Sequence, residues 1–117
     1  MTAADDAVTT ITFSDPYTFD EWLAAVSPLL AHGPTLRALV DRTRATAPSR
    51  EFVDRMANFF QRNAEHTKGW RAAVVTGTDA GYGVARMLQL TNEARAVPMQ
   101  LRAFRDFAEA RRWLASS

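Results

Sequence analysis

Apolar residues alternate with polar ones in four short segments of this chain, and they recur every three or four positions in the segments between. Alternation is typical of strands, whereas the wider spacing indicates helices with one buried face. Strands are expected at 8–13, 35–41, 70–75 and 99–105. The pattern therefore predicts four strand-helix units in succession.

Helix-capping residues stand at several expected helix starts. Thr18 and Glu21 form a capping-box pair before the first helix, which Gly33-Pro34 ends. Ser49 is placed to cap a helix over 50–65, and Asp106 to cap the last helix. These start signals support the boundaries that the apolar spacing indicates.

Two connecting segments lack apolar periodicity. The stretch 42–48 is expected to be a loop. The glycine-rich segment 77–83 is expected to be a turn into the helix that carries Val84 and Met87, with Asp79 as a helix N-cap.

The polar positions within the strands indicate how the sheet is covered. Strands joined by helical crossovers are normally parallel, with right-handed crossovers. A strand buried on both faces would be continuously apolar, but polar residues interrupt the last three strands at Arg37, Asp41, Arg71, Gln100 and Arg102. We therefore expect an α/β fold: a (βα)4 right-handed superhelix with a mainly parallel four-stranded sheet, helices mainly on one face and a partly polar opposite face. The alternative is a flavodoxin-like doubly wound sheet.

Composition narrows the class of protein. A chain of 117 residues with 47% hydrophobic content suits one domain over 1–117, with 1–7 expected to be a flexible tail. A net charge of +1 argues against nucleic-acid partners. Without cysteine there is no disulfide or thiolate zinc site, and without an apolar run of roughly 20 residues we expect a cytoplasmic protein with no stable membrane insertion. Lys68 is the only lysine beside abundant Arg and Ala, which favours a bacterial source.

Several motifs carry a family resemblance over residues 8–114: LRALVD at 36–41, RAAVV at 71–75, VARM at 84–87 and LRAFRDFAEARRWL at 101–114. With this order of elements, the chain resembles the SpoIIAA-like family, small bacterial proteins related in fold to STAS and Sec14-type domains. The resemblance implies a four-turn βα superhelix, no catalysis for most members, and regulatory or lipid-related roles. In the anti-sigma-factor antagonists of that superfamily a serine in Asp-Ser-Ser-Gly is phosphorylated. Ser49 takes a comparable place, but its context, Ala-Pro-Ser-Arg-Glu, lacks the second serine and the glycine, which argues against a phosphorylation switch.

The segment from Thr76 to Gly83 matches the Thr-Gly-x-x-x-Gly-x-Gly turn of short-chain dehydrogenases. There, glycines let backbone amides approach a pyrophosphate at a helix N-terminus. Here Gly77, Thr78, Gly81 and Gly83 would form such a site, yet only one strand follows and no Tyr-x-x-x-Lys pair exists. We therefore prefer to interpret this segment as a plain strand-to-helix turn. The alternative is a nucleotide-binding turn in a nucleotide-dependent enzyme, with Asp41 or Asp15 as the base.

Charged residues gather at the expected carboxyl ends of the strands, the edge where open parallel sheets bind ligands. They are Asp15, Asp41, Arg42, Arg44, Arg86 and Arg105. Arginines at this edge would hold a carboxylate or phosphate, and solvated loop charges are the plainer interpretation.

The two histidines and the Phe59-Phe60 pair are two further patterns. His32 and His66 have no second ligand at metal spacing, so no metal site is expected. Phe59-Phe60 indicates a wide buried helix face, or else a dimer surface or lipid-sized groove that Met56 or Phe60 forms together with the partly polar sheet face.

Together these features predict a non-enzymatic regulatory or ligand-binding module without a cofactor. It would act through a protein partner or a small anionic or lipid ligand. A structural homo-oligomer, such as a homodimer, is a third alternative.

Overall fold

The computed structural model describes residues 8–116, so the tail expected at 1–7 lies outside the described residues. The strands are β1 (Val8–Ser14), β2 (Arg37–Arg44), β3 (Arg71–Thr76) and β4 (Gln100–Phe104). The helices are α1 (Phe19–Val26), the 3-10 helix η1 (Ser27–Ala31), α2 (Arg50–Arg62), α3 (Ala64–Thr67), α4 (Asp79–Ala94) and α5 (Phe107–Ala115). The four expected strand-helix units are all present.

The sheet has four parallel strands in the order β1-β2-β3-β4. Val8, Arg37, Arg71 and Gln100 lie side by side in register across it. The predicted α/β fold with a parallel four-stranded sheet is confirmed. The strands lie in the sheet in the order in which they occur in the chain. There is therefore no pair of neighbouring strands at which the direction of the connections reverses.

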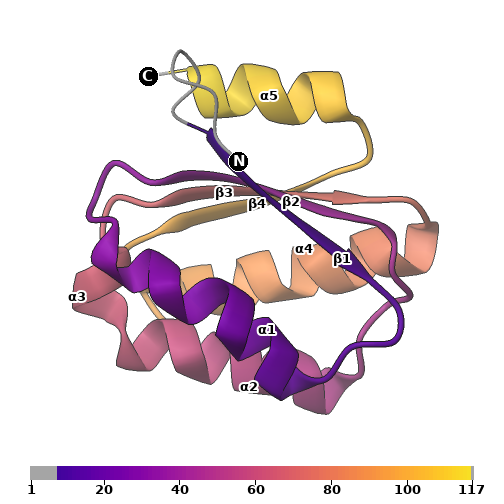
Figure 1. Cartoon of the computed structure of the whole chain (residues 1–117), viewed down its shortest axis with the longest axis horizontal. Helices are drawn as coiled ribbons and strands as arrows, with labels where there is room; N and C mark the ends of the chain where they lie inside the picture. Colours follow the sequence, from indigo (N-terminus) through magenta and orange to yellow (C-terminus); the bar gives the residue numbers. More distant parts are fainter. Residues whose placement is uncertain (1–7, 117) are drawn as a thin grey trace.

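Helices α1, α2 and α4, which connect the strands, cover one face of the sheet, and α5 lies alone on the other (Figure 1). The first face carries most of the core, including Trp22, Val53 and Phe60. On the second face, Leu39, Val75 and Phe104 pack beneath α5, while Arg37 and Arg102 remain half-buried or exposed. The partly polar face is therefore apolar in the middle, where the last helix covers it.

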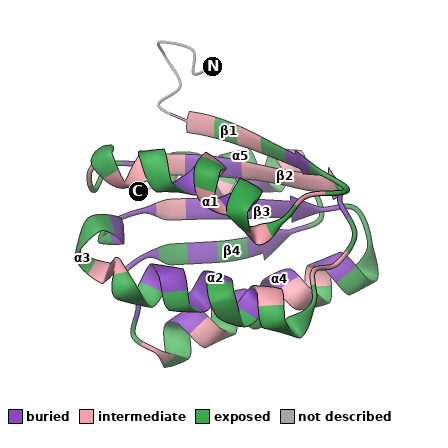
Figure 2. Cartoon of the chain, turned by 60° about the horizontal axis from the view of Figure 1, so that its bottom comes forward, coloured by how far each residue is buried: buried purple, intermediate pink, exposed green. Residues whose placement is uncertain are grey.

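Figure 2 shows the consequence of this layering, with the purple buried positions concentrated on the sheet and on the inner sides of the helices. Phe59 and Phe60 are both buried, at 6% and 5% exposure. The wide buried face expected for α2 is thus confirmed, and those two rings offer no outer surface to a partner.

Three predicted helix starts have the expected caps, among them α5, where the Asp106 carboxylate accepts from the Glu109 amide at 3.1 Å. The hydroxyl of Thr18 accepts from the Glu21 amide while the Glu21 carboxylate accepts from the Thr18 amide, which is a complete capping box. The Ser49 hydroxyl accepts from the Phe52 amide at 3.1 Å. Local side-chain chemistry therefore sets where α1 and α2 begin.

Apart from shifts of one or two residues at other strand ends, three boundaries differ from expectation. Strand β2 continues to Arg44, although 42–48 was expected to be a loop, because Asp41 and Arg42 pair with β3 and Arg44 pairs with β1. Backbone pairing on both sides outweighs the polar character of these residues. The helix expected over 50–65 ends at Arg62, and Asn63 separates it from α3.

The third difference is at the glycine-rich segment. Helix α4 begins at Asp79, so Gly81 and Gly83 are helical and only Gly77 belongs to the turn. The N-cap is Thr78, whose hydroxyl accepts from the Gly81 amide at 3.0 Å, and not Asp79.

Candidate functional site

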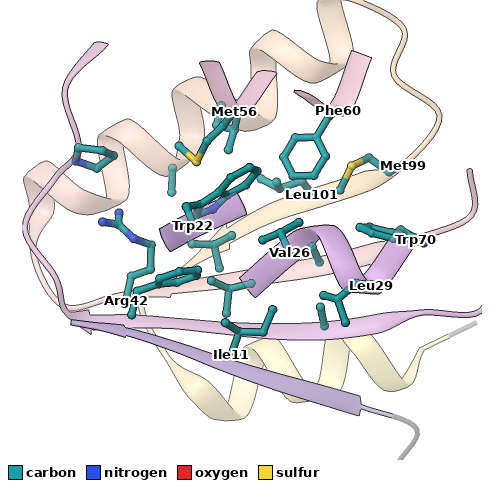
Figure 3. Close-up of a pocket in the computed structure, with 18 of the residues that line it drawn as sticks. Ile11, Trp22, Val26, Leu29, Arg42, Met56, Phe60, Trp70, Met99 and Leu101 are labelled. Atoms are coloured by element: carbon teal, nitrogen blue, oxygen red, sulfur yellow. The ribbon is translucent and has the colours of Figure 1, made fainter. Parts of the chain in front are cut away.

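An apolar cavity of about 70 Å³ lies between the sheet and the layer formed by α1, α2 and α4. Its wall includes Trp22, Val26, Met56, Phe60, Met99 and Leu101 (Figure 3). Among the described residues that line it, Arg42 is the single charged one. A nearly uniform apolar wall with one convergent charge is a common composition for small-molecule sites.

The sequence explains why the helices leave this space. Trp22 of α1 packs edge-on against Phe59 and Phe60 of α2, with ring centroids 5.3 and 5.7 Å apart. These large rings meet each other above the sheet, while the sheet presents the small side chains of Ala38 and Ala72 to the cavity. Rings that contact one another over alanines leave unfilled volume, which is uncommon in close-packed interiors.

Arg42 lies at the cavity end nearest the carboxyl ends of the strands, and Trp70 lies at the other end (Figure 3). The Arg42 guanidinium donates to the Thr46 carbonyl at 3.0 Å, at the surface, and lies 5.6 Å from the centre of the Tyr17 ring. Arg42 therefore reaches from the apolar cavity to the solvent, as long cationic side chains commonly do.

Residues near Arg42 connect the loop that follows β1 to the loop that follows β2. The Asp15 carboxylate accepts from the Thr46 amide at 2.7 Å, and this hydrogen bond holds the pKa of Asp15 below its usual value. Burial raises the pKa of Tyr17, against an opposing effect of the nearby Arg42 charge. The phenol therefore stays neutral at physiological pH, and the negative charge that Arg42 interacts with here is the Asp15 carboxylate, whose pKa Arg42 also lowers.

The charged residues expected at the strand ends do not form one site. Asp41 lies on the α5 side of the sheet, because it alternates with Arg42 along β2, and its carboxylate accepts from the Thr43 amide and hydroxyl. Arg44 is exposed and Arg86 is half-buried on α4. Arg105 forms an ion pair with Asp79. Of the predicted cluster, only Arg42 and Asp15 come together, through Thr46.

The topology accounts for this dispersal. Ligands bind at the carboxyl edge of doubly wound sheets because neighbouring connections leave to opposite faces and open a crevice. Here β1, β2, β3 and β4 follow one another and the connecting helices share one face. In this fold the apolar cavity lies between the sheet and the connecting helices instead.

The glycine-rich segment has a structural explanation. A Cβ atom on Gly77 would lie 2.7 Å from the Thr43 carbonyl oxygen, so glycine lets β3 pass close to β2. The Gly81 amide, which would have to face a phosphate, is already bonded to Thr78, and the Asp79 carboxylate stands at the same helix end. Gly83 has open space around it.

The other candidate residues lie at helix ends or within short helices. The hydroxyl of Ser49 caps α2. His32 ends η1 and His66 lies in α3. Over residues 8–116 no group of His, Asp and Glu is placed to hold a metal ion.

Sequence reasoning missed Tyr17, Trp22 and Trp70 as site residues. Tyr17 has no motif partner in sequence, and its relation to Arg42 arises only when the two loops meet. A usable signal was the density of large aromatic residues in α1 and α2, opposite alanines in the second and third strands. Met56 and Phe60 lie in the cavity wall, on the side of the sheet away from its partly polar face.

Comparison with known proteins leaves the family open: no family model, no curated protein and no solved structure matches the chain. Within the described residues, no helix is both long enough and apolar enough to cross a bilayer.

Proposed function

We propose that this chain is a non-enzymatic binding module of SpoIIAA-like type, whose ligand is a small carboxylate with an apolar tail. The carboxylate pairs with Arg42 and the tail enters the cavity beneath α1. The observation that carries the proposal is the single cationic side chain in an otherwise apolar wall. A guanidinium binds a carboxylate through two parallel N–H donors, so one arginine suffices for one headgroup.

The cavity limits the size of the tail. An apolar cavity of about 150 Å³ admits benzene, and this one is about 70 Å³. By that comparison a short alkyl group fits without change, whereas a branched or longer chain requires α1 to move outward. Such a movement would rearrange the ring contacts of Phe19 with Phe52 and of Trp22 with Phe59. Ligand uptake coupled to a shift of α1 would supply a regulatory signal to a protein partner.

The test is a titration with octanoate and with isovalerate, followed by tryptophan fluorescence and calorimetry. Octanol serves as the uncharged probe. Arg42→Gln is expected to weaken binding of both acids about tenfold or more, as loss of a charge-assisted hydrogen bond does. Arg44→Gln is the matched control, because Arg44 is exposed two positions along the same strand and is absent from the cavity wall.

The outcome separates the components of the proposal. Saturable binding of the acids that is lost in Arg42→Gln and retained in Arg44→Gln supports it. Equal binding of octanol and octanoate would remove the role of Arg42, and no binding of any probe would overturn the proposal as a whole.

Self-association is a second candidate, favoured by a different surface. Met87 and Leu90 are exposed at 43% and 50% and are three residues apart on α4, so they lie on one side of that helix. A second copy that packs against this side would cover them. Light scattering coupled to gel filtration tests this: a dimer that Leu90→Glu converts to a monomer supports it, and a monomeric parent chain at high concentration overturns it.

A further inference from the structure

A second cavity, of about 260 Å³, lies at the amino ends of the strands, away from Arg42. Its wall contains Arg37, Gly69, Trp70, Arg71, Pro98 and Gln100. Every side chain in this wall that ends in a charged or amide group carries N–H donors, and none of the described residues that form the wall is acidic. We call this space the arginine-pair cavity.

The two arginines are held next to each other by the sheet. Arg37 of β2 and Arg71 of β3 are partners in register, and Gln100 of β4 is the next partner of Arg71. Residues that pair across neighbouring strands project from the same face. The register therefore places two guanidinium groups and an amide in one row.

Neither guanidinium has a carboxylate partner within residues 8–116, where the one ion pair joins Arg105 to Asp79. Arg37 donates to the carbonyls of Leu36 and Gly69, at 3.0 and 3.2 Å. These acceptors orient the side chain but carry no net charge.

Arg71 is held similarly. It donates to the carbonyl and hydroxyl of Ser116 and lies 4.4 Å from the centre of the Trp113 ring. Its Nε atom is buried and has no acceptor among residues 8–116. Burial lowers the pKa of this group, and the charge of Arg37 lowers it further.

Two like charges on neighbouring strands repel each other, and an arrangement of this kind lowers stability unless something compensates both charges. A monovalent anion compensates one of them. A dianion with several oxygens compensates both and accepts from both guanidinium groups and from the Gln100 amide.

We infer that the arginine-pair cavity binds a phosphate group, as free inorganic phosphate or as a small phosphate monoester. This site is separate from the proposed carboxylate site at Arg42, and the cavity volume leaves room for a substituent on the phosphate. Trp70 lines both cavities, so its fluorescence responds to either ligand.

The test is a titration of the full chain with inorganic phosphate, glycerol phosphate and acetate at one ionic strength, since salt alone screens exposed charges. Thermal unfolding and tryptophan emission are the measurements. Phosphate or its ester is expected to raise the melting temperature saturably, as a ligand bound only by the folded state does, while acetate has no comparable effect.

Arg37→Gln is expected to weaken phosphate affinity about tenfold or more. Arg112→Gln is the matched control, because it removes the same charge from an exposed position on α5 outside the cavity. Arg71→Lys is the second variant, which keeps the charge but loses the planar group, and it is expected to weaken binding without loss of the fold. The parent and each variant are compared by circular dichroism.

A saturable phosphate effect that Arg37→Gln abolishes and Arg112→Gln preserves supports the site, and the ester arm shows whether a substituent is accepted. An effect shared equally with acetate, or lost equally in both glutamine variants, would overturn it. Absence of any phosphate effect on the parent chain would do the same, and neither result bears on octanoate binding at Arg42.

Discussion

Asp41 and Arg42 are adjacent in β2, yet their side chains lie on opposite faces of the sheet. Arg42 lines the cavity under α1, whereas Leu39, two residues before Asp41, packs beneath α5. Asp41→Asn is therefore expected to change octanoate affinity by less than about twofold, because a partly exposed charge on the far side of a sheet interacts weakly with the headgroup. Fluorescence titration measures it, and a loss comparable to that of Arg42→Gln would contradict the placement.

Gly77 and Gly83 are expected to respond oppositely to alanine. Gly77→Ala places a Cβ atom 2.7 Å from a backbone oxygen of Thr43, and this overpacking is expected to lower the unfolding free energy by about 1–3 kcal/mol. Gly83 lies within α4, and the methyl group of Gly83→Ala would meet no other atom. This substitution is expected to raise the unfolding free energy by about 0.5–1 kcal/mol. Urea unfolding of both variants measures the difference. Destabilisation by Gly83→Ala would indicate a role for that glycine beyond the helix.

Val74 and Val75 provide a matched pair for the apolar cavity. Val74→Ile adds a methylene on the cavity side and is expected to stabilise the fold by about 0.8 kcal/mol while it weakens octanoate binding. Val75 is fully buried beneath α5, so Val75→Ile is expected to destabilise by about 1–3 kcal/mol. Thermal unfolding and titration measure the two effects. Stronger octanoate binding by Val74→Ile would argue that the tail lies elsewhere.

Asn92 is a buried polar residue of α4, 2% exposed, whose side-chain oxygen and nitrogen have no partner among the described residues. Asn92→Leu is expected to raise the unfolding free energy by about 1 kcal/mol, since an unsatisfied amide is replaced by an apolar group of similar size. Asn92→Asp, which buries a charge at the same place, is expected to destabilise. Denaturant unfolding compares the three proteins, and a less stable leucine variant would point to a polar partner for Asn92.

Asp15 gives the fold an acid-sensitive element. Its folded pKa is depressed by the hydrogen bond from Thr46, so its contribution to stability is present above the unfolded pKa of about 3.9 and is lost as pH falls through the lower folded value. Asp15→Asn is expected to flatten the decline in melting temperature below about pH 4. Asp54→Asn, an exposed carboxyl on α2, is the control. Identical pH profiles for the parent and Asp15→Asn would contradict this role.

The parts of the fold that sequence predicts depend on local chemistry. Thr18, Glu21 and Ser49 hydrogen-bond to residues three positions away, so their capping roles are readable from spacing alone. The polar residues within strands likewise indicated that the connecting helices share one face. The extension of β2 through Arg42 depends on backbone pairing with strands distant in sequence, which no local pattern encodes.

The candidate site was only partly predictable for the same reason. Arg42 was named from its place after an apolar strand, but its neighbour Tyr17 is 25 positions away and meets it only in the folded chain. The cavity itself is a gap between Trp22 and the alanines of the sheet, and unfilled volume has no sequence motif. Sequence alone left a phosphate-binding turn at Gly77 as an alternative to a plain strand-to-helix turn, because close packing against Thr43 and close approach to a phosphate both require glycine.

The agreement between strand order and chain order has a kinetic consequence. Residues that pair across neighbouring strands are only about 30 positions apart throughout the sheet, so each new pairing closes a loop of similar and moderate length. Chains whose contacts are of this range fold faster than those that must first join distant ends. Assembly can therefore advance one strand-helix unit at a time, and α5 shields the apolar centre of the remaining face.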